Sequence, residues 1–575
     1  MSERSEQVAP ADWLDRWGPR TLAVVVVAAI VARLWLVFHR LWDPDELEHL
    51  HAGFCVWRGM VPYRDFFEQH GPVLWYVSLP LFWWRGASLD VLAAGRFVIW
   101  VLGAITIALV WRLGNRLYGR WGGSLASLLL VLLPPFQEKN IEWRPDNVAV
   151  PLVLIALCAA ADSFGPRGWR WAGVFGASLA GGFFCTQKVV FVAAGMVAGY
   201  FVTLFVETRR RVAAAQVGGV VDAELTGRGF WSRLGAAIAG AVLVAGGFML
   251  FFSAQGSLDD FLRDTIWRPL NWKSREPVRN YLNMCLIEGP VFYGAAAAGL
   301  VLTLADARHA AALRSGVLVL IGGVLAHAAG LLVVPAAFLQ YYLPHWPLAA
   351  LFGARALSEL VAKSAVAAGT ARGTRWLAVA AAIGVTATAI FRAWKTSPVD
   401  PVWHVAVIVA LVLGSAATLL ATRRLAVFAL IASGAVSAAP FHHAQFVAWS
   451  RTHEFQVLHF QRLLRATDPE DQFLDGFTGF GALRPHAFAY FWINHHSWPM
   501  VPDAEKVAGV RRALADERTR VVLMDGNLRR SLSAEVISFL VENFEIDARY
   551  SWPGCAIYVR HGRELPTPFD WPSTQ

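Results

Sequence analysis

The chain has 575 residues, of which 56% are hydrophobic and only 16% are charged. Its mean hydropathy of +0.44 excludes an ordinary soluble globular protein. Long apolar stretches recur along the first three-quarters of the chain, which is typical of a protein that crosses a membrane many times. The formal net charge of +9 does not indicate nucleic-acid binding, because the arginines lie mostly in short loops between apolar stretches, where they set membrane orientation.

About 13 apolar stretches are long enough to form membrane-spanning helices. These predicted spans are Thr21–Phe38, Val91–Leu113, Trp121–Phe136, Asn147–Ala161, Trp169–Phe184, Val189–Val206, Leu234–Phe252, Pro290–Ala305, Gly316–Val334, Phe338–Leu357, Trp376–Trp394, Pro401–Leu420 and Leu425–Phe441. The stretch Val73–Trp84 has about a dozen residues, too few for a hydrocarbon core of ~30 Å, so we expect it to lie in the outer interface. Arg33 lies within the first span, which we interpret as an uncleaved helix, and should pair with an acidic group in the bundle.

Arginine placement predicts the orientation. With about 13 spans, the arginine-rich loops all fall on the side of the N-terminus, which the positive-inside rule assigns to the cytoplasm. The loop after the first span, the loop around Asp146, the segment Ser253–Gly289 and the C-terminus then face outward. We therefore predict a multi-pass protein of the bacterial inner (plasma) membrane, with a cytoplasmic N-terminus and a periplasmic C-terminal domain.

The composition changes after Phe441. Residues 442–575 combine short β-like runs with helical patterns, which predicts a small α/β domain outside the membrane. The β-like runs are Phe473–Phe477, Val521–Met524 and Ala556–Val559, and the helical patterns lie near Phe446–Arg465, Ala504–Ala515 and Ala534–Asn543. The predicted fold class is an α-helical polytopic membrane protein, with a transmembrane domain at 1–441, a first outer loop with interfacial helices at 39–90, and the extracytoplasmic α/β domain at 442–575.

An acidic segment, Trp42–His51, directly follows the first span. Asp43 suits the N-cap of a helix, and Glu46 stands three residues later, as in a capping box. Asp45 is not needed for this cap and lies near the positive end of the helix, which favours its ionised form. We predict Asp45 as a general base, with Glu46 as a second catalytic candidate beside its capping role. The alternative is that Asp43 and Glu46 only start a helix.

Other polar residues of the outer loops are candidates for binding a polar ligand. In the first loop they are Arg64, Glu68 and His70, and the alternative is an interfacial loop of solvated charges with aromatic anchors. The second outer loop carries Arg144 and Asp146 directly before a span. The alternative for this second pair is a simple ion pair and helix cap.

Further cations point to an anionic ligand. Lys188 lies between two apolar stretches, where a lysine at membrane depth costs about 2.5–3.5 kcal/mol, so it needs an anionic partner such as a lipid phosphate. The alternative is a lysine that snorkels to the interface. Arg268 is one of five cations in the segment Ser253–Gly289. A carboxylate base with convergent cations at an outer membrane face suits transfer from a phosphate-leaving lipid donor to a hydroxyl group.

The five cysteines are scattered, with no spacing typical of a metal or redox site. They are Cys55, Cys158, Cys185, Cys285 and Cys555. We expect them to be small buried residues, and we predict no metal and no cofactor, although the clustered acids could hold a divalent cation.

Several short motifs together resemble the C-type membrane glycosyltransferases, which have the GT-C fold. They are Asp45-Glu46 after the first span, the run from Pro62 to Pro72 (PYRDFFEQHGP), Arg144-Pro145-Asp146, and the run from Gln340 to Pro347 (QYYLPHWP). The resemblance covers about residues 20–360 and is strongest to the lipid A aminoarabinose transferases, the rhizobial galacturonosyltransferases and the protein O-mannosyltransferases. It implies a polyprenyl-phosphate sugar donor, an inverting displacement and a periplasmic site.

The resemblance also implies roles for single residues. Asp45 is similar to the catalytic aspartate of the family's first loop, and Glu68 to the acidic residue that follows it. Asp146 is similar to the acid of the second loop, and Lys188 and Tyr341 to contacts of the donor phosphate. The chain departs from the aminoarabinose transferases in the residue after Glu68, where they carry a lysine and this chain has a glutamine.

The predicted function is therefore transfer of a sugar from a polyprenyl-phosphate donor to a hydroxyl of a lipid, a polysaccharide or a protein. We expect the protein to contact membrane lipids and not to bind nucleic acid. One alternative is a proton- or cation-coupled transporter or flippase of a lipid-linked sugar. Transporters usually show internal repeats, and we see none in the sequence. The other alternative is a non-catalytic surface-sensing or assembly protein that acts through its C-terminal domain.

Overall fold

The computed structural model describes residues 13–165, 167–216, 227–272, 276, 278–306, 316–361, 452–494 and 497–567. Three predicted spans, Trp376–Trp394, Pro401–Leu420 and Leu425–Phe441, lie outside these residues. The predicted boundary between residues 441 and 442 also lies outside them, so the proposed division into two domains stays a prediction.

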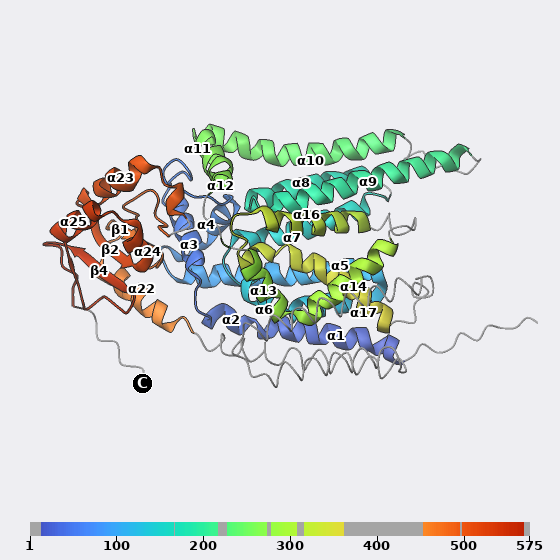
Figure 1. Ribbon diagram of the computed structural model, residues 1–575, viewed down its shortest axis with the longest axis horizontal. Coiled ribbons are helices and arrows are strands. Elements are labelled where there is room, and N and C mark those ends of the chain that lie inside the picture. Colours follow the sequence, from blue (N-terminus) through green and yellow to red (C-terminus); the bar gives the residue numbers. More distant parts are fainter. Residues whose placement is uncertain are drawn as a thin grey trace, which may run out of the picture.

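The described apolar segments form a bundle of helices that run side by side (Figure 1). Its long members are α1 (Trp13–Ala32), α5 (Asp90–Val131), α7 (Pro145–Asp162), α8 (Gly168–Cys185), α9 (Val189–Gln216), α10 (Gly227–Ala254), α14 (Pro290–Asp306), α16 (Val317–Val333) and α17 (His345–Val361). The short helix α2 (Leu34–His39) follows α1. Among the described residues, five helices are long and apolar enough to cross a membrane, or six if α14 and the preceding α13 (Val278–Glu288) form one bent span. A multi-pass helical architecture is confirmed, but a count of about 13 spans is not.

A glycine joins two of the predicted spans. Helix α5 contains both Val91–Leu113 and the start of Trp121–Phe136, and it kinks at Gly119, whose φ of 74° suits a residue without a Cβ atom. The two halves then pack closely, since a Cβ atom on Gly114 would lie 2.6 Å from the carbonyl oxygen of Gly122. The second half ends at Val131, earlier than predicted, because a new helix begins at Pro134.

The last described span is also shorter than its apolar pattern. The stretch Phe338–Leu357 is not one helix: a 3-10 turn at Leu339–Tyr342 precedes α17, which begins at His345. Pro344 separates the two, because proline cannot donate a backbone hydrogen bond within a helix and restricts the residue before it.

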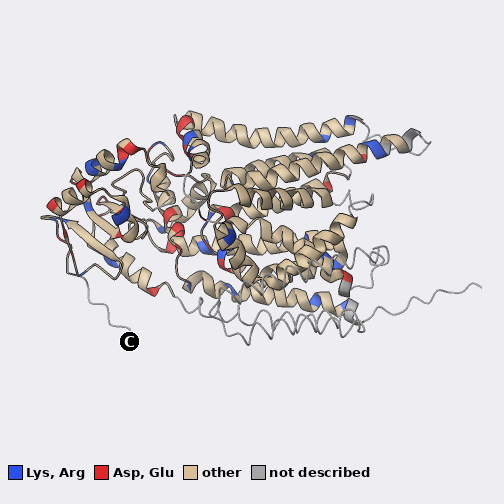
Figure 2. Ribbon diagram, viewed as in Figure 1, with Lys and Arg blue, Asp and Glu red and all other residues tan. Residues whose placement is uncertain are grey.

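Shorter helices gather at one end of the bundle (Figure 1). They are α3 (Pro44–Trp57), α4 (Val73–Arg85), α6 (Pro134–Lys139), α11 (Leu258–Leu262) with the π-helical turn Arg263–Trp267, and α12 (Arg268–Leu270). Helix α4 forms where the interfacial helix was predicted. The arginines at the end of α9, Arg209 and Arg210, lie at the opposite end of the bundle, and charged residues are sparse along the middle of the long helices (Figure 2). The acidic segment and this basic segment thus lie at opposite ends, as predicted.

The C-terminal residues form a four-stranded sheet with helices on it. Its strands are β1 (Gln472–Asp475), β2 (Thr519–Asp525), β3 (Phe544–Ile546) and β4 (Cys555–Arg560), in the order β1-β2-β4-β3. β1 and β2 are parallel and the other pairs are antiparallel. The helices are α22 (Glu454–Ala466), α23 (Asp503–Ala515), α24 (Gly526–Ser531) and α25 (Ala534–Asn543). The predicted α/β character is confirmed, although β3 and α24 were not predicted because each is so short.

One hydrophobic core joins this α/β unit to the first outer loop. Buried residues of α3 and α4, such as Leu47 and Trp75, share a cluster with Phe480 and Val521 of the α/β unit. The chain also returns beside the acidic segment, where the backbone of Trp42 exchanges two hydrogen bonds with the Gln456 side chain, at 2.7 and 2.9 Å. The α/β unit therefore packs directly on the helix that carries Asp45.

Candidate active site

The acidic segment begins helix α3 with a capping box, as predicted. The Asp43 carboxylate accepts from the backbone N–H of Asp45 at 3.0 Å, and the Glu46 carboxylate accepts from the backbone N–H of Asp43 at 3.0 Å. Pro44 occupies the first helical turn, where its missing N–H costs nothing. This cap fixes the start of the helix and thereby the backbone position of Asp45.

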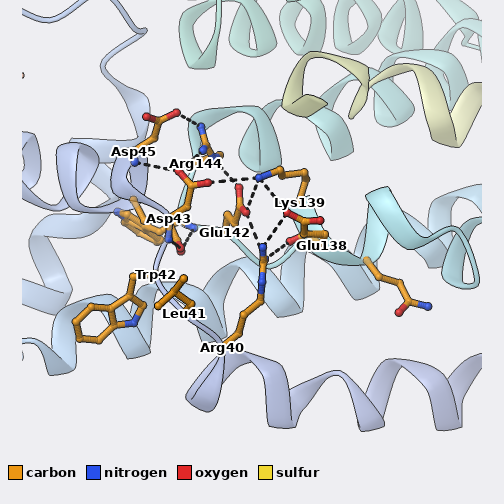
Figure 3. Close-up of polar contacts among 12 residues, drawn as sticks. Arg40, Leu41, Trp42, Asp43, Asp45, Glu138, Lys139, Glu142 and Arg144 are labelled. Carbon is orange, nitrogen blue, oxygen red and sulfur yellow. Dashed lines mark hydrogen bonds and ion pairs between the residues drawn. The ribbon is translucent and has the colours of Figure 1, made fainter. Parts of the chain in front are cut away.

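Arg144 connects the two outer loops. Its guanidinium donates to Asp45 and Asp43 at 2.6 Å each and to Glu142 at 2.6 Å (Figure 3). The Arg144 side chain is 4% exposed, whereas that of Asp45 is 25% exposed. Burial by itself would raise the pKa of Asp43, but Arg144 and Lys139 outweigh it and hold that pKa well below its ordinary value. Arg144 therefore keeps a partly exposed carboxylate in place at the mouth of the bundle.

A buried network of charged side chains holds Glu142, one of the partners of Arg144. Glu142 accepts from Lys139 at 2.9 Å and from Arg40 at 3.3 Å, and Arg40 also pairs with Glu138 at 2.9 Å (Figure 3). Asn147 donates to the backbone carbonyls of Lys139 and Glu142, which holds the second loop in shape. Such a network is stable only because each buried charge has several partners.

Glu46 is a buried ion-pair partner in the structure. Its carboxylate, fully buried, accepts from Arg96 at 2.8 and 2.5 Å and from the backbone N–H of Trp143 at 2.8 Å. Burial alone would raise the pKa of Glu46, but Arg96 lowers it. With both oxygens occupied and no exposed surface, Glu46 cannot reach a substrate, so we correct its predicted catalytic role to a structural one.

Lys188 pairs with the acid of the second loop. Its Nζ atom lies 3.2 Å from Oδ1 of Asp146 and 3.8 Å from the centre of the Tyr341 ring. Asp146 lies in the first turn of α7, and its predicted alternative, an ion pair with Arg144, is replaced by this contact with Lys188. Burial lowers the pKa of Lys188 more than Asp146 raises it. These three predicted residues thus form a second group.

Glu48, to which the sequence assigned no role, lies between the Arg144 group and the Lys188 group. Glu48 is 5% exposed, and its pKa is raised well above its ordinary value by burial and by the nearby charges of Glu68 and Asp45. Arg144 and Lys188 are also near enough to act on it. The available signal was its position three residues after Asp45, which places both side chains on one face of a helix.

Glu68 and His70 lie beside Glu48. The Glu68 carboxylate accepts from two backbone N–H groups and lies 2.7 Å from Nδ1 of His70. His49, Glu68 and His70 present ligand atoms within 4.8 Å of one another, so they are the residues of this site that could share a cation. The loop is held closely against α8, since a Cβ atom on Gly71 would lie 2.1 Å from the carbonyl oxygen of Phe184.

Two predicted arginines lie at the edge. Arg64 pairs with its neighbour Asp65 at 2.8 Å and, within the described part of the chain, makes no hydrogen bond or ion pair to the groups above. Arg268 donates to the Tyr490 hydroxyl at 2.9 Å and lies over the rings of Phe67 and Tyr490. Arg268 therefore joins the first loop to the α/β unit.

Arg33 finds a different partner from the one predicted. Its guanidinium donates to the carbonyl of Gln137 at 3.3 Å and to the Asn140 side chain at 3.5 Å, and it lies over the Phe136 ring. The expected acidic partner is replaced by the carbonyl end of the short helix α6, which offers negative charge of its own.

Solved structures identify the class of fold. The structure of ArnT from Cupriavidus metallidurans bound to undecaprenyl phosphate matches with a TM-score of 0.58 at 13% identity, covering 95% of this chain and 99% of that chain. The apo oligosaccharyltransferase of Archaeoglobus fulgidus matches with a TM-score of 0.53 at 12% identity, covering 96% of this chain and 76% of that chain. The chain is thus a multi-pass membrane protein with the GT-C fold, as the motifs predicted.

One family model matches part of the sequence. Residues 79–221 match the family described as dolichyl-phosphate-mannose-protein mannosyltransferase. The matched region holds α5 to α9, with Arg144, Asp146 and Lys188. No curated protein sequence matches this chain.

Proposed function

We propose that this protein transfers a sugar from a polyprenyl-phosphate donor to a hydroxyl group of a lipid, glycan or protein, with inversion at the sugar. The proposal places the reaction at the end of the bundle that carries α3, on the periplasmic face of a bacterial inner membrane. The fold shared with ArnT, which was solved with undecaprenyl phosphate bound, supports a lipid-phosphate donor.

The observation that carries the proposal concerns the hydrogen bonds of the two carboxylate oxygens of Asp45. Oδ2 of Asp45 accepts from Arg144 at 2.6 Å, while Oδ1 has no hydrogen-bond partner within the described part of the chain. The other carboxylates bound to Arg144 are Asp43, which caps α3, and Glu142, which is fully buried. Asp45 is therefore the partly exposed acid of this group with an oxygen free to accept a proton.

The chemistry follows from this arrangement. The acceptor hydroxyl gives its proton to Oδ1 of Asp45 while its oxygen forms a bond to the anomeric carbon. The bond from that carbon to the phosphate oxygen breaks, and the polyprenyl phosphate leaves with the electron pair. Lys188, braced by Asp146 and Tyr341, is placed to stabilise the charge that develops on the departing phosphate. General base catalysis of this kind contributes about 10²–10⁴ in rate.

The direct test is Asp45→Asn in the full-length protein, assayed with radiolabelled polyprenyl-phosphate sugars and a cell-envelope extract as acceptor. We expect kcat to fall by about 10²–10⁴, with a smaller change in the KM for the donor. The matched control is Asp90→Asn, because Asp90 is an exposed acid at the start of α5. Full transfer by Asp45→Asn would refute the base assignment, and a wild-type protein that releases polyprenyl phosphate from none of the donors would refute the proposed function.

A further inference from the structure

Three potential metal ligands meet between α3 and the α/β unit. His51 and Cys55 lie one turn apart on α3, and His486 follows β1 in the α/β unit. Nε2 of His51 lies 2.9 Å from Nδ1 of His486, and the Cys55 sulfur lies 3.4 and 3.6 Å from these two nitrogens. None of these three side chains belongs to the Asp45, Lys188 or Glu68 groups, so the proposed reaction does not account for them.

Both histidine rings meet backbone groups of the chain. Nδ1 of His51 lies 2.9 Å from the carbonyl oxygen of Ala482, which makes it the donor nitrogen and leaves Nε2 with a lone pair. The ring of His486 is held by a hydrogen bond with the backbone of Asp65. A histidine that binds a metal almost always donates its other N–H to a backbone carbonyl or a carboxylate, and His51 shows this arrangement.

The distances suit one small ion. Zinc binds histidine nitrogen at about 2.0–2.1 Å and cysteine sulfur at about 2.3 Å, so a tetrahedral site separates two nitrogens by about 3.3 Å and a nitrogen from sulfur by about 3.5 Å. The observed separations are 2.9 Å for the nitrogens and 3.4 and 3.6 Å to sulfur. Side-chain shifts of a few tenths of an ångström would therefore admit the ion.

The surroundings favour a retained ion. His51 and Cys55 are buried, and the rings of Phe66 and Phe491 pack against the histidines. A pocket large enough for a water molecule borders both imidazoles and is also lined by Asp475. In a zinc site with three protein ligands, such a water would take the fourth position.

We propose that His51, Cys55 and His486 bind a zinc ion that ties the α/β unit to helix α3. One thiol and two imidazoles are ligands that zinc prefers, and binding releases the thiol proton of Cys55. The ion stabilises the packing of the α/β unit on the helix that carries Asp45. This inference does not depend on the proposed glycosyl transfer.

The test uses the full-length protein in detergent, stripped with a chelator and titrated with Co²⁺ and then with Zn²⁺. We expect one equivalent of Co²⁺ to bind with a thiolate-to-cobalt charge-transfer absorption, and Zn²⁺ to displace it. Cys55→Ser should abolish this absorption, and Cys55→Ser and His486→Gln should each weaken Zn²⁺ binding by at least about 100-fold. The wild-type result stands even if a variant fails to fold.

Two controls separate this site from others. Cys185→Ser removes a different buried thiol and should leave binding unchanged. Glu68→Gln should also leave the charge-transfer absorption unchanged, because Glu68 belongs to the His49–Glu68–His70 group. The proposal is overturned if the wild-type protein binds no metal, or if the charge-transfer absorption survives Cys55→Ser. In either case the close approach of His51 and His486 is an ordinary hydrogen bond between two rings.

Discussion

Glu48 shows how one side chain acquires its chemistry from its neighbours. In the sequence it is one of four carboxylates in a short acidic segment. In the structure it is buried beside Glu68 and Asp45, so its neutral form is favoured while Asp45 stays partly exposed and paired with Arg144. Burial and the neighbouring negative charges thus favour the neutral form of Glu48, and acids with perturbed pKa values of this kind are common at catalytic sites.

This difference predicts a pH dependence of stability. Because the pKa of Glu48 is raised in the folded protein, its contribution to stability is complete below the ordinary pKa of 4.5 and is lost as the pH rises through the raised value. Glu48→Gln cannot ionise, so the thermal midpoint of the wild-type protein should fall relative to that of the variant as the pH increases above 4.5.

The measurement is a thermal unfolding series in detergent at several pH values. Glu470→Gln is the control, since Glu470 lies on the surface with a side chain that is 71% exposed. Parallel pH profiles for the wild-type protein and Glu48→Gln would show that Glu48 is not held neutral.

Helix α3 is positioned by its first turn. Its capping box, the ion pair of Glu46 with Arg96, and the contact of Arg144 with Asp43 tie the helix start to α5 and to the second loop. The rest of α3 is buried against α4 and the α/β unit. An element with so many fixed contacts can hold Asp45 in one orientation, which is what a catalytic group requires.

Two variants test the buried ion pair between Glu46 and Arg96. Glu46→Ala leaves the guanidinium of Arg96 buried without its partner, and should lower the free energy of unfolding by about 3–5 kcal/mol. Combining Glu46→Leu with Arg96→Met removes both charges and should recover part of the loss, since replacing a buried ion pair by apolar residues is often neutral. Chemical unfolding of the purified proteins gives these energies, and an unchanged stability of Glu46→Ala would contradict the structural role.

The candidate active site and the proposed zinc site lie at one end of the molecule. The acidic segment, the second loop, the π-helical turn and the α/β unit meet there, while Arg209 and Arg210 lie at the other end (Figure 2). From the positive-inside rule we expect the end that carries Arg210 to be cytoplasmic and the site to face outward, where a lipid-linked donor would reach it from the membrane.

Cysteine labelling tests this orientation. A cysteine in place of Arg64, whose side chain is 45% exposed, should react with a membrane-impermeant reagent on intact cells. A cysteine in place of the exposed Arg210 should react only after the membrane is opened. The five native cysteines are all buried, so their background should be low. Labelling of the Arg210 position alone in intact cells would reverse the proposed topology.

Local patterns of the sequence were enough to predict much of the architecture. Apolar stretches near the length of a bilayer correspond to α7, α8, α9 and α10, because span length and hydropathy are properties of neighbouring residues. The capping box at Asp43 was readable for the same reason, since all its partners lie within one turn. The ordered motifs around Asp45, Glu68, Asp146 and Tyr341 also indicated the fold that the solved structures show.

Contacts between distant segments could not be read in this way. The partner of Glu46 lies on α5, Arg33 binds the end of α6 where an acid was expected, and Asp146 pairs with Lys188. Cys55 and His486 are 431 positions apart and meet because the α/β unit folds back on α3. Periodicity and spacing describe a chain only over a few turns. The burial and the partners of a side chain depend instead on which elements pack together in the tertiary structure. Burial and partners in turn decide whether an acid ionises, caps a helix or binds a ligand.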